Sequence, residues 1–265
     1  MNLMNKLEIN LDEHFKHLSH APIIEAVIDI RASSNELLEE MSFKSQIEPK
    51  LVNYQFLDSP REIQFHLQHV VGSKESTPSP PMIKDLGWKG LRFRSNDGKQ
   101  IVQFNKDGFG FNRLAPYLNW ESLHDEAIRL WKHYVALARP IEINRLGVRF
   151  INRFQMPVGE VRFQDYLTPS PEAPGGLDLP FINFLHQDTL AVPEYPFVIN
   201  IVKTIQPPSV PDGMPLTLVL DIDVFTMNVF DFDEEILKRK LSEMRWLKNK
   251  VFFGSITEKT LKLFE

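Results

Sequence analysis

Two Asp-Gly pairs constrain the fold of residues 90–113 more than any other feature of the chain. The segment reads GLRFRSNDGKQIVQFNKDGFGFNR, with alternating apolar and polar residues around both pairs. Asp-Gly tolerates the positive backbone angles of a two-residue hairpin turn, and a period of two is typical of half-buried strands. The segment is therefore predicted to form a three-stranded antiparallel meander, with turns at Asp97-Gly98 and Asp107-Gly108.

Two-residue turns also fix which side chains lie opposite one another, because they set the register of the strands. The row that faces the core would then contain Leu91, Phe104 and Phe111. The next row, which faces outwards, would contain Arg92, Gln103 and Asn112.

Each half of the chain ends its strands with a long amphipathic helix. Residues 120–138 carry apolar side chains at helical spacing, and so does a final helix that Asp233 can cap. A first helix is expected from Ser34 or Asn35 to Pro49, and a short one near residues 161–167. Further strands are expected at residues 21–31, 61–71, 141–154, 197–205 and 216–225, with Pro-rich connections at 72–84 and 168–196.

The order strand, helix, strands, long helix occurs twice, which indicates an internal duplication. We therefore expect an α+β protein with two antiparallel sheets, each covered by helices on one face. The expected units are an N-terminal segment at residues 1–20, a first half at 21–139 and a second half at 140–265, packed as one body.

The strand at residues 143–154, INRLGVRFINRF, has an arginine at every fourth position from Arg145. Side chains alternate along a strand, so one face would carry Leu146, Val148 and Phe150 and pack on helices. The other face would carry Ile143, Arg145, Gly147, Arg149, Ile151 and Arg153. Other charged residues expected on polar strand faces are Arg92, Arg94, Glu25, Asp29, Asp221 and Asp223.

Three interpretations of this arginine ridge are open. Cross-strand pairs with acidic residues would simply cover a solvated sheet face. An anionic ligand could instead bind there, because the arginine fork matches phosphate or carboxylate. The face could also dock a protein, since arginine is enriched in interfaces. The candidate binding residues are Arg145, Arg149, Arg153, Arg92, Arg94, Gln103 and Asn112.

Arg149 is the expected centre of such a site, because Gly147 beside it on the same face would leave room for a ligand. Asp221 and Asp223 are weaker candidates for a metal site. They share a strand face, but no third carboxylate lies near them in the sequence, so salt bridging is favoured over magnesium binding.

Composition narrows the function classes. The chain has 265 residues, a formal net charge of -5 and no cysteine. The acidic balance argues against a dedicated nucleic-acid binder but leaves a local basic groove open. Without cysteine, disulfides and thiolate metal sites cannot form. The sequence shows neither a signal-peptide core nor a membrane-spanning window, so we expect a cytoplasmic protein.

Three stretches, APIIEAVIDI, LGVRFINRF and FFGSITEKTLKLF, resemble a family of sporadically distributed bacterial proteins of similar length. That family begins with an API-x-EA strand and has a midchain strand with two arginines around a glycine, followed by an aromatic residue, Ile and Asn. It has no established activity, so the resemblance implies no catalytic residues. Its patchy distribution implies mobile genes, such as defence or toxin-antitoxin loci.

Two functions are therefore expected. The first is a non-enzymatic binding or regulatory protein whose arginine-lined sheet face docks a protein partner, because the sequence contains no GxSxG, HExxH or P-loop motif. The alternative is a protein that binds or hydrolyses a nucleotide or another phosphorylated small molecule, with the arginines as clamps and the two aspartates as metal ligands. No cofactor is expected, and the oligomeric state is left open.

Overall fold

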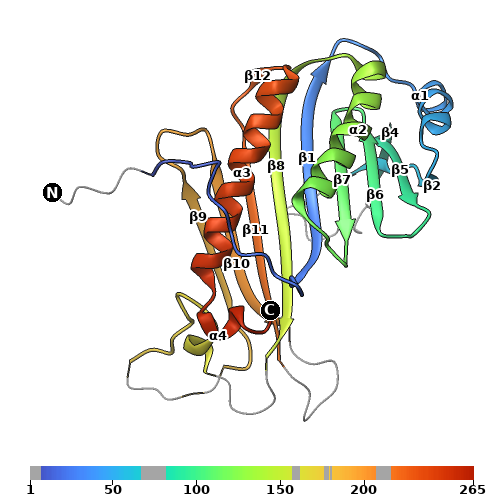
Figure 1. The fold of residues 1–265 in the computed structure, drawn as a ribbon. Coiled ribbons are helices and arrows are strands. Elements are labelled where there is room, and N and C mark those ends of the chain that lie inside the picture. The colour runs from blue at the N-terminus through green and yellow to red at the C-terminus, as the bar shows by residue number, and fades with distance from the viewer. Residues whose placement is uncertain (1–6, 67–81, 157–161, 176–178, 180, 207–215) are drawn as a thin grey trace, which may run out of the picture.

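The computed structural model describes residues 7–66, 82–156, 162–175, 179, 181–206 and 216–265. The fold is α+β, with one ten-stranded antiparallel sheet, a separate two-stranded sheet, and both long helices on one face of the large sheet (Figure 1). None of the described helices is both long enough and apolar enough to cross a membrane.

The strand order of the large sheet is mirrored about its centre. The path is β2-β5-β6-β7-β1-β8-β11-β10-β9, and β12 also pairs with β8. The two expected sheets are therefore joined edge to edge by the pairing of β1 with β8, and each half contributes one side in the same order. The strands are β1 (Ile23–Ser34), β2 (Tyr54–Asp58), β5 (Gly90–Ser95), β6 (Gln100–Asn105), β7 (Gly108–Leu114), β8 (Pro140–Gln155), β9 (Leu185–Ala191), β10 (Val198–Gln206), β11 (Thr217–Thr226) and β12 (Phe230–Asp231).

The helices begin at the capping residues that the sequence offers. In α2 (Trp120–Ala138) the Asn119 side chain accepts a hydrogen bond from the Ser122 amide at 2.8 Å. In α3 (Glu234–Ser255) Asp233 accepts one from the Ile236 amide at 2.8 Å, as predicted. Such bonds satisfy amides that have no partner within the helix. The shorter helices are α1 (Glu40–Ile47) and α4 (Glu258–Leu261), with 3-10 turns at Glu48–Lys50 and Phe163–Asp165.

The core lies between the large sheet and the two long helices. The meander at β5, β6 and β7 is confirmed, and its phenylalanine-rich face packs on α2. The Phe104 and Phe109 rings are 5.7 Å apart, and Phe109 meets Trp131 of α2 at 5.8 Å in an edge-to-face contact. Trp131 is 1% exposed. The buried aromatic rings therefore hold the first half together.

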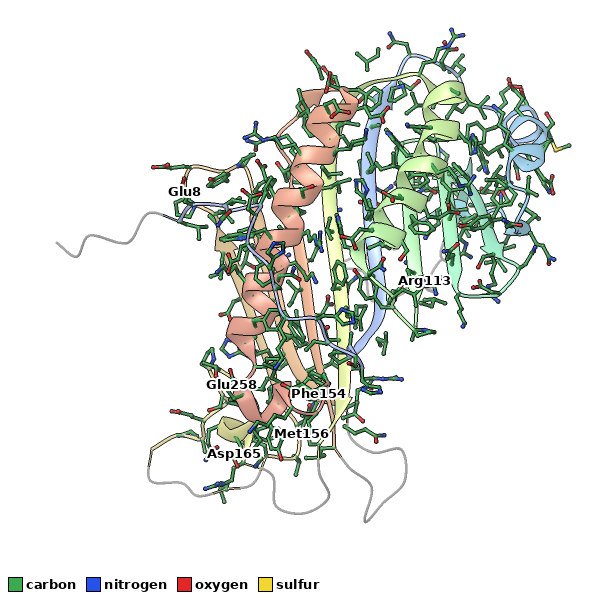
Figure 2. All side chains as sticks on the ribbon, in the orientation of Figure 1. Glu8, Arg113, Phe154, Met156, Asp165 and Glu258 are labelled. Atoms are coloured by element: carbon green, nitrogen blue, oxygen red, sulfur yellow. The ribbon has the colours of Figure 1, made fainter. Side chains whose placement is uncertain are left out.

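The C-terminal end of the chain closes the lower end of β8. Figure 2 shows Phe154 and Met156 there, beside Asp165 and Glu258. The Phe154 ring meets that of Phe264 at 5.3 Å, and Lys259 forms an ion pair with Asp165 at 3.0 Å. The end of the second half is thus packed on the strand that begins it.

The register between β6 and β7 differs from the prediction by two residues. Phe104 lies opposite Phe109 and not Phe111, and Gln103 lies opposite Gly110 and not Asn112. The turn is Lys106-Asp107, so Gly108 is the first residue of β7. A Cβ on Gly108 would lie 2.0 Å from the Ile30 carbonyl oxygen, so this close approach of β7 to β1 requires a glycine.

The first helix begins later than predicted. Strand β1 continues to Ser34, which pairs with Pro140, and α1 begins only after Glu39, whose side chain makes no capping bond. The Ser34 hydroxyl instead accepts a hydrogen bond from the Glu36 amide at 2.9 Å. Leu37, an apolar residue within the span predicted for that helix, is 95% exposed.

Other differences from the sequence-based expectations concern short elements. The helix expected near 161–167 is reduced to the 3-10 turn Phe163–Asp165. The region expected as a loop at 168–196 contains the edge strand β9, which is exposed on both faces. The small sheet pairs β3 (Arg61–His66) with β4 (Met82–Trp88), so β4 begins inside the expected linker. Residues 67–81 lie outside the described part of the chain.

We expect Trp131→Ala to lower the free energy of unfolding by about 3–5 kcal/mol, because it leaves a large cavity in the core. The indole Nε1 has no hydrogen-bond partner in the described residues, so the loss reflects packing alone. Trp131→Phe, which keeps a ring against Phe109, should cost less than about 2 kcal/mol. Urea unfolding measures both, and a loss under about 1 kcal/mol for the alanine variant would contradict the buried position.

Candidate functional site

The predicted arginine ridge lies on the face of the large sheet opposite α2 and α3. Arg145, Arg149 and Arg153 project from β8 between β1 and β11, whose acidic residues lie within reach. Ile143, expected on the same face, is buried in the core instead. The pairing of β1 with β8 shifts register between Arg31 and Ala32, and this irregularity turns Ile143 to the other side.

Arg145 is held by two carboxylates. Its Nη1 donates to Asp29 Oδ2 at 2.6 Å, and its Nη2 donates to Asp223 Oδ2 at 3.2 Å. The guanidinium lies 5.0 Å from the centre of the Phe225 ring. Phe225 lies opposite Gly147 in the pairing of β11 with β8. A Cβ on Gly147 would lie 2.7 Å from Arg145 Nη1. The room predicted for a ligand beside Gly147 is therefore filled by Arg145 itself.

Arg149 forms a bidentate ion pair with Asp221. Its Nε donates to Oδ1 at 2.9 Å and its Nη2 to Oδ2 at 2.5 Å, and this bonding raises the pKa of Arg149. Burial raises the pKa of Asp223 in spite of the neighbouring Arg145. Arg153 is exposed and has no side-chain partner among the described residues. These contacts are those of a salt-bridged sheet face.

The other predicted residues share this face but lie in the outer strands. Arg92 pairs with Asp58, and Asn112 donates to Glu25 at 2.6 Å. Arg94 and Gln103 make no recorded polar contact within the described ranges. Strand β5 lies four strands from β8, roughly 19 Å at the usual strand spacing. The predicted residues therefore do not gather around one point.

Asp221 and Asp223 do not assemble a metal site with a third ligand. Each pairs with an arginine of β8, and the described part of the chain contains no group of three His, Cys, Asp or Glu side chains able to hold a metal ion.

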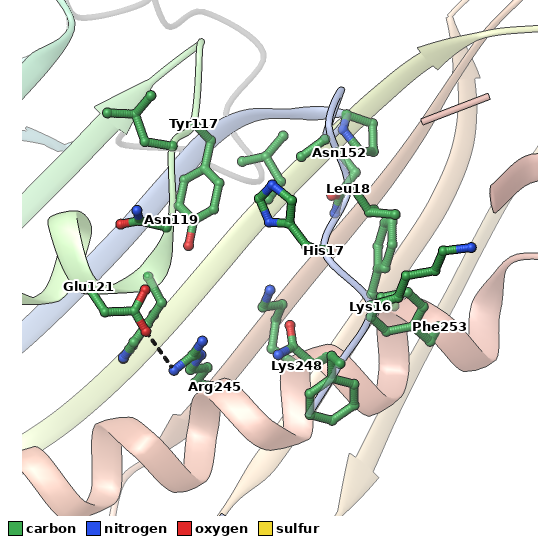
Figure 3. Close-up of a pocket in the computed structure, with 18 residues that line it drawn as sticks. Lys16, His17, Leu18, Tyr117, Asn119, Glu121, Asn152, Arg245, Lys248 and Phe253 are labelled. Carbon is green, nitrogen blue, oxygen red and sulfur yellow. Dashed lines mark ion pairs between the residues drawn. The ribbon is translucent and has the colours of Figure 1, made fainter. Parts of the chain in front are cut away.

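A cavity of about 200 Å³ lies on the opposite, helix-covered face of the sheet. It is bounded by α3, the start of α2, strand β8 and residues 7–22, which form neither helix nor strand and which we call the N-terminal strap (Figures 1 and 3). The lining residues are Phe15, Lys16, His17, Leu18, Ala21, Pro22, Ile23, Tyr117, Leu118, Asn119, Trp120, Glu121, Asn152, Arg245, Lys248, Asn249, Phe252 and Phe253. We call it the Lys248 cavity.

Phe150 of β8 is buried beneath the Lys248 cavity, and two of the residues that line the cavity contact its ring. The Lys248 ammonium lies 4.0 Å from the centre of the Phe150 ring, and the Tyr117 ring meets the same ring edge to face at 5.5 Å. Asn152 follows two residues later on the same face of β8. Figure 3 shows the Lys248 amine opposite His17 of the strap, and the Tyr117 hydroxyl on the side of the cavity where Glu121 and Arg245 lie.

Lys248 is the unusual group of this cavity. Its side chain is buried, and it makes no hydrogen bond or ion pair with any described residue. Burial, followed by the charge of Arg245, lowers the pKa of Lys248 to about 7. Desolvation disfavours the charged form of a lysine, and here no carboxylate offsets it. When protonated, the amine is therefore a cation with no counter-anion among the described residues.

Two other polar groups on the floor are incompletely bonded. The Asn152 amide nitrogen donates to the Leu220 carbonyl oxygen at 3.0 Å, which leaves its Oδ1 without a partner in the described structure. The Tyr117 hydroxyl likewise makes no recorded hydrogen bond there, and burial raises its pKa. Lys248, Asn152 and Tyr117 all line the cavity, so water or a ligand there can complete the hydrogen bonding of these three groups.

The charges at the rim of the cavity are already neutralised. Arg245 pairs with Glu121 at 3.2 Å and lies over the Trp120 ring, while Lys16 pairs with Glu265 at 2.5 Å. Lys248 thus supplies the unpaired positive charge.

The N-terminal strap is held over the cavity by side-chain contacts. Glu13 accepts hydrogen bonds from Trp246 Nε1 at 2.8 Å and from Lys250 Nζ at 2.5 Å, and the Phe15 ring stacks on Phe253 at 5.7 Å. The strap therefore forms one wall of the cavity, which is still partly open to solvent.

The sequence does contain a signal for this site, in the apolar patterns of α3 and β8 and not on the polar strand faces. Lys248 continues the helical spacing of the apolar residues Leu241 and Met244, and Asn152 continues the alternation of Val148 and Phe150. A charged or polar residue at a core position of an otherwise regular pattern is the feature to look for. No protein-family model, curated protein or solved structure matches the chain.

We expect the three ridge arginines to differ in their effect on stability. Arg145→Gln should cost about 2 kcal/mol, because it leaves the half-buried Asp223 without an ion pair and Asp29 with only the 3.4 Å contact to Arg31. Arg149→Gln should cost about 1 kcal/mol or less, since that arginine is half exposed. Arg153→Gln should change stability by less than about 0.5 kcal/mol. Urea unfolding at neutral pH tests this order, and equal effects would contradict it.

The buried Lys248 should make stability depend on pH. Its pKa is about 7 when folded against an ordinary value of 10.5. Between these values the unfolded chain holds a proton that the folded chain has released, so the free energy of unfolding rises with pH by at most about 1.4 kcal/mol per unit. Lys248→Met removes this contribution. The stability gained by Lys248→Met should therefore be largest near neutral pH and shrink in alkali, whereas a constant difference would refute the assignment.

Proposed function

We propose that this chain is a non-enzymatic binding protein that holds a small anionic ligand in the Lys248 cavity. The observation that carries the proposal is the buried Lys248 amine, which lies over the Phe150 ring, has no hydrogen-bond or ion-pair partner among the described residues, and lines a cavity. The proposal keeps the binding function expected from the sequence and moves its site to the other face of the sheet.

Electrostatics favour an anion at this position. An unpaired charge out of water is unfavourable, and an opposite charge within about 4–6 Å favours the ionised lysine. A bound anion would therefore raise the pKa of Lys248 and restore its proton. Tyr117 also lines the cavity, and its hydroxyl is a potential second donor. The site needs no reacting group, and the proposal assigns none.

One observation favours a second function, docking of a protein on the open sheet face. Arg153 and Arg94 are exposed without recorded partners in the described residues, and half-buried apolar side chains such as Ile151 and Phe225 lie between the ion pairs. Arginine and aromatic residues are enriched in interfaces. A regulatory role in a mobile defence or toxin-antitoxin locus stays a prediction from the family resemblance.

Calorimetric titration with benzoate, phenyl phosphate and inorganic phosphate tests the binding function. At least one of these anions should bind the wild type, and Lys248→Met should abolish that binding. Lys240→Met is the matched control, because Lys240 lies on the same helix and also contacts aromatic rings. Binding that survives in Lys248→Met, or no binding of any of the three anions, would overturn the proposal.

Affinity should also fall as pH rises. Above pH 7 the free protein must take up a proton at Lys248 to hold an anion, so the dissociation constant should rise by up to about tenfold per pH unit. The other charged or titratable groups around the amine are Arg245, Glu121, Lys16, His17 and Tyr117. The pH dependence should persist in His17→Gln, and a pH-independent affinity would contradict the role of Lys248.

A further inference from the structure

We infer that the ligand of the Lys248 cavity is a monoanionic carboxylate with an apolar body, and not a phosphate ester or a nucleotide. This inference rests on the proposed function and specifies the class of molecule that the cavity accepts.

The charges of the residues that line the cavity favour a ligand with a single negative charge. Arg245 is neutralised by Glu121 at 3.2 Å, and Lys16 by Glu265 at 2.5 Å. Lys248 then has one positive charge to offer. A phosphate monoester carries nearly two charges at neutral pH, so one of them would stay uncompensated among aromatic walls.

The walls of the cavity select an apolar body. Lys248 and Tyr117 gather at Phe150 on the floor, so the charged end of a ligand would lie against β8. Above them the lining turns apolar, with Phe15 and Leu18 from the strap and Phe252 and Phe253 from α3. A carboxylate with a ring or branched chain fits this polarity, with its body pointing towards the strap.

The size of the cavity favours a ligand smaller than a nucleotide. A volume of about 200 Å³ corresponds to roughly seven water molecules. Sites for drug-sized ligands are larger, about 300–1,000 Å³. A single ring with a carboxylate can enter the Lys248 cavity, whereas a base, a sugar and phosphates together cannot without displacing the strap.

Three probes that share one phenyl ring test the inference: benzoate, its neutral amide benzamide, and phenyl phosphate. At neutral pH we expect benzoate to bind at least about tenfold more tightly than either of the others. In Lys248→Met the cavity becomes neutral, so the preference should invert and benzamide should bind more tightly than benzoate. Titration calorimetry gives the constants, and far-UV circular dichroism checks that the variant is folded. If it is not, Lys248→Gln carries the same comparison.

The outcomes separate this inference from the proposed function. One outcome is that phenyl phosphate binds as tightly as benzoate or more tightly, with binding that still requires Lys248. In that case the inference of a monocarboxylate ligand is wrong, and the proposed anion-binding function is supported. If benzamide and benzoate bind with equal affinity, and Lys248→Met binds both as tightly as the wild type does, the charge of Lys248 has no role in binding. Both the proposed anion site and the monocarboxylate ligand are then wrong. If none of the probes binds, the site itself is overturned.

Discussion

The pairing of β1 with β8 is the interaction on which the rest of the structure depends. Each strand begins one half of the chain, and together they join two half-sheets into one. On one face the pair presents Ile28 and Val148, both fully buried beneath the helices. On the other it presents Asp29 and Arg145, which bond to each other at 2.6 Å. The central pair of strands therefore separates an apolar side, covered by helices, from a charged side that is open to solvent. A polar group on the covered side is an exception to this pattern.

Sequence patterns correctly predicted the features that are set within a single segment of the chain. The alternation around residues 90–113 and the helical spacing of residues 120–138 each predicted the correct element, because each segment buries one face. Register could not be predicted so well. The turn at Lys106-Asp107 is fixed by the contact of Gly108 with β1, a strand far away in the sequence. Strand β9 left no pattern because both of its faces are exposed.

The difference between features set within one segment and features built from several segments also explains which candidate sites could be predicted from the sequence. The arginine ridge was visible in the sequence because it follows one strand, but its meaning lay in Asp29 and Asp223, which come from two other strands. The Lys248 cavity is built from the strap, the start of α2, α3 and β8, so no local pattern could outline it. What the sequence did contain was the exception at the position of Lys248, a charge within an apolar helix face.

A second buried lysine in the same chain shows why that exception matters. Lys203 of β10 is 3% exposed, and burial lowers its pKa as well. Its ammonium donates to the Thr168 carbonyl oxygen at 3.0 Å, so a neighbouring loop satisfies the buried charge. Lys248, 8% exposed, has a ring beneath it and open space beside it, with no carbonyl or carboxylate from the described residues within reach. The fold can thus provide partners for a buried lysine, and at Lys248 it provides a cavity instead. This contrast between the two buried lysines is what supports the proposal of an anion site at Lys248.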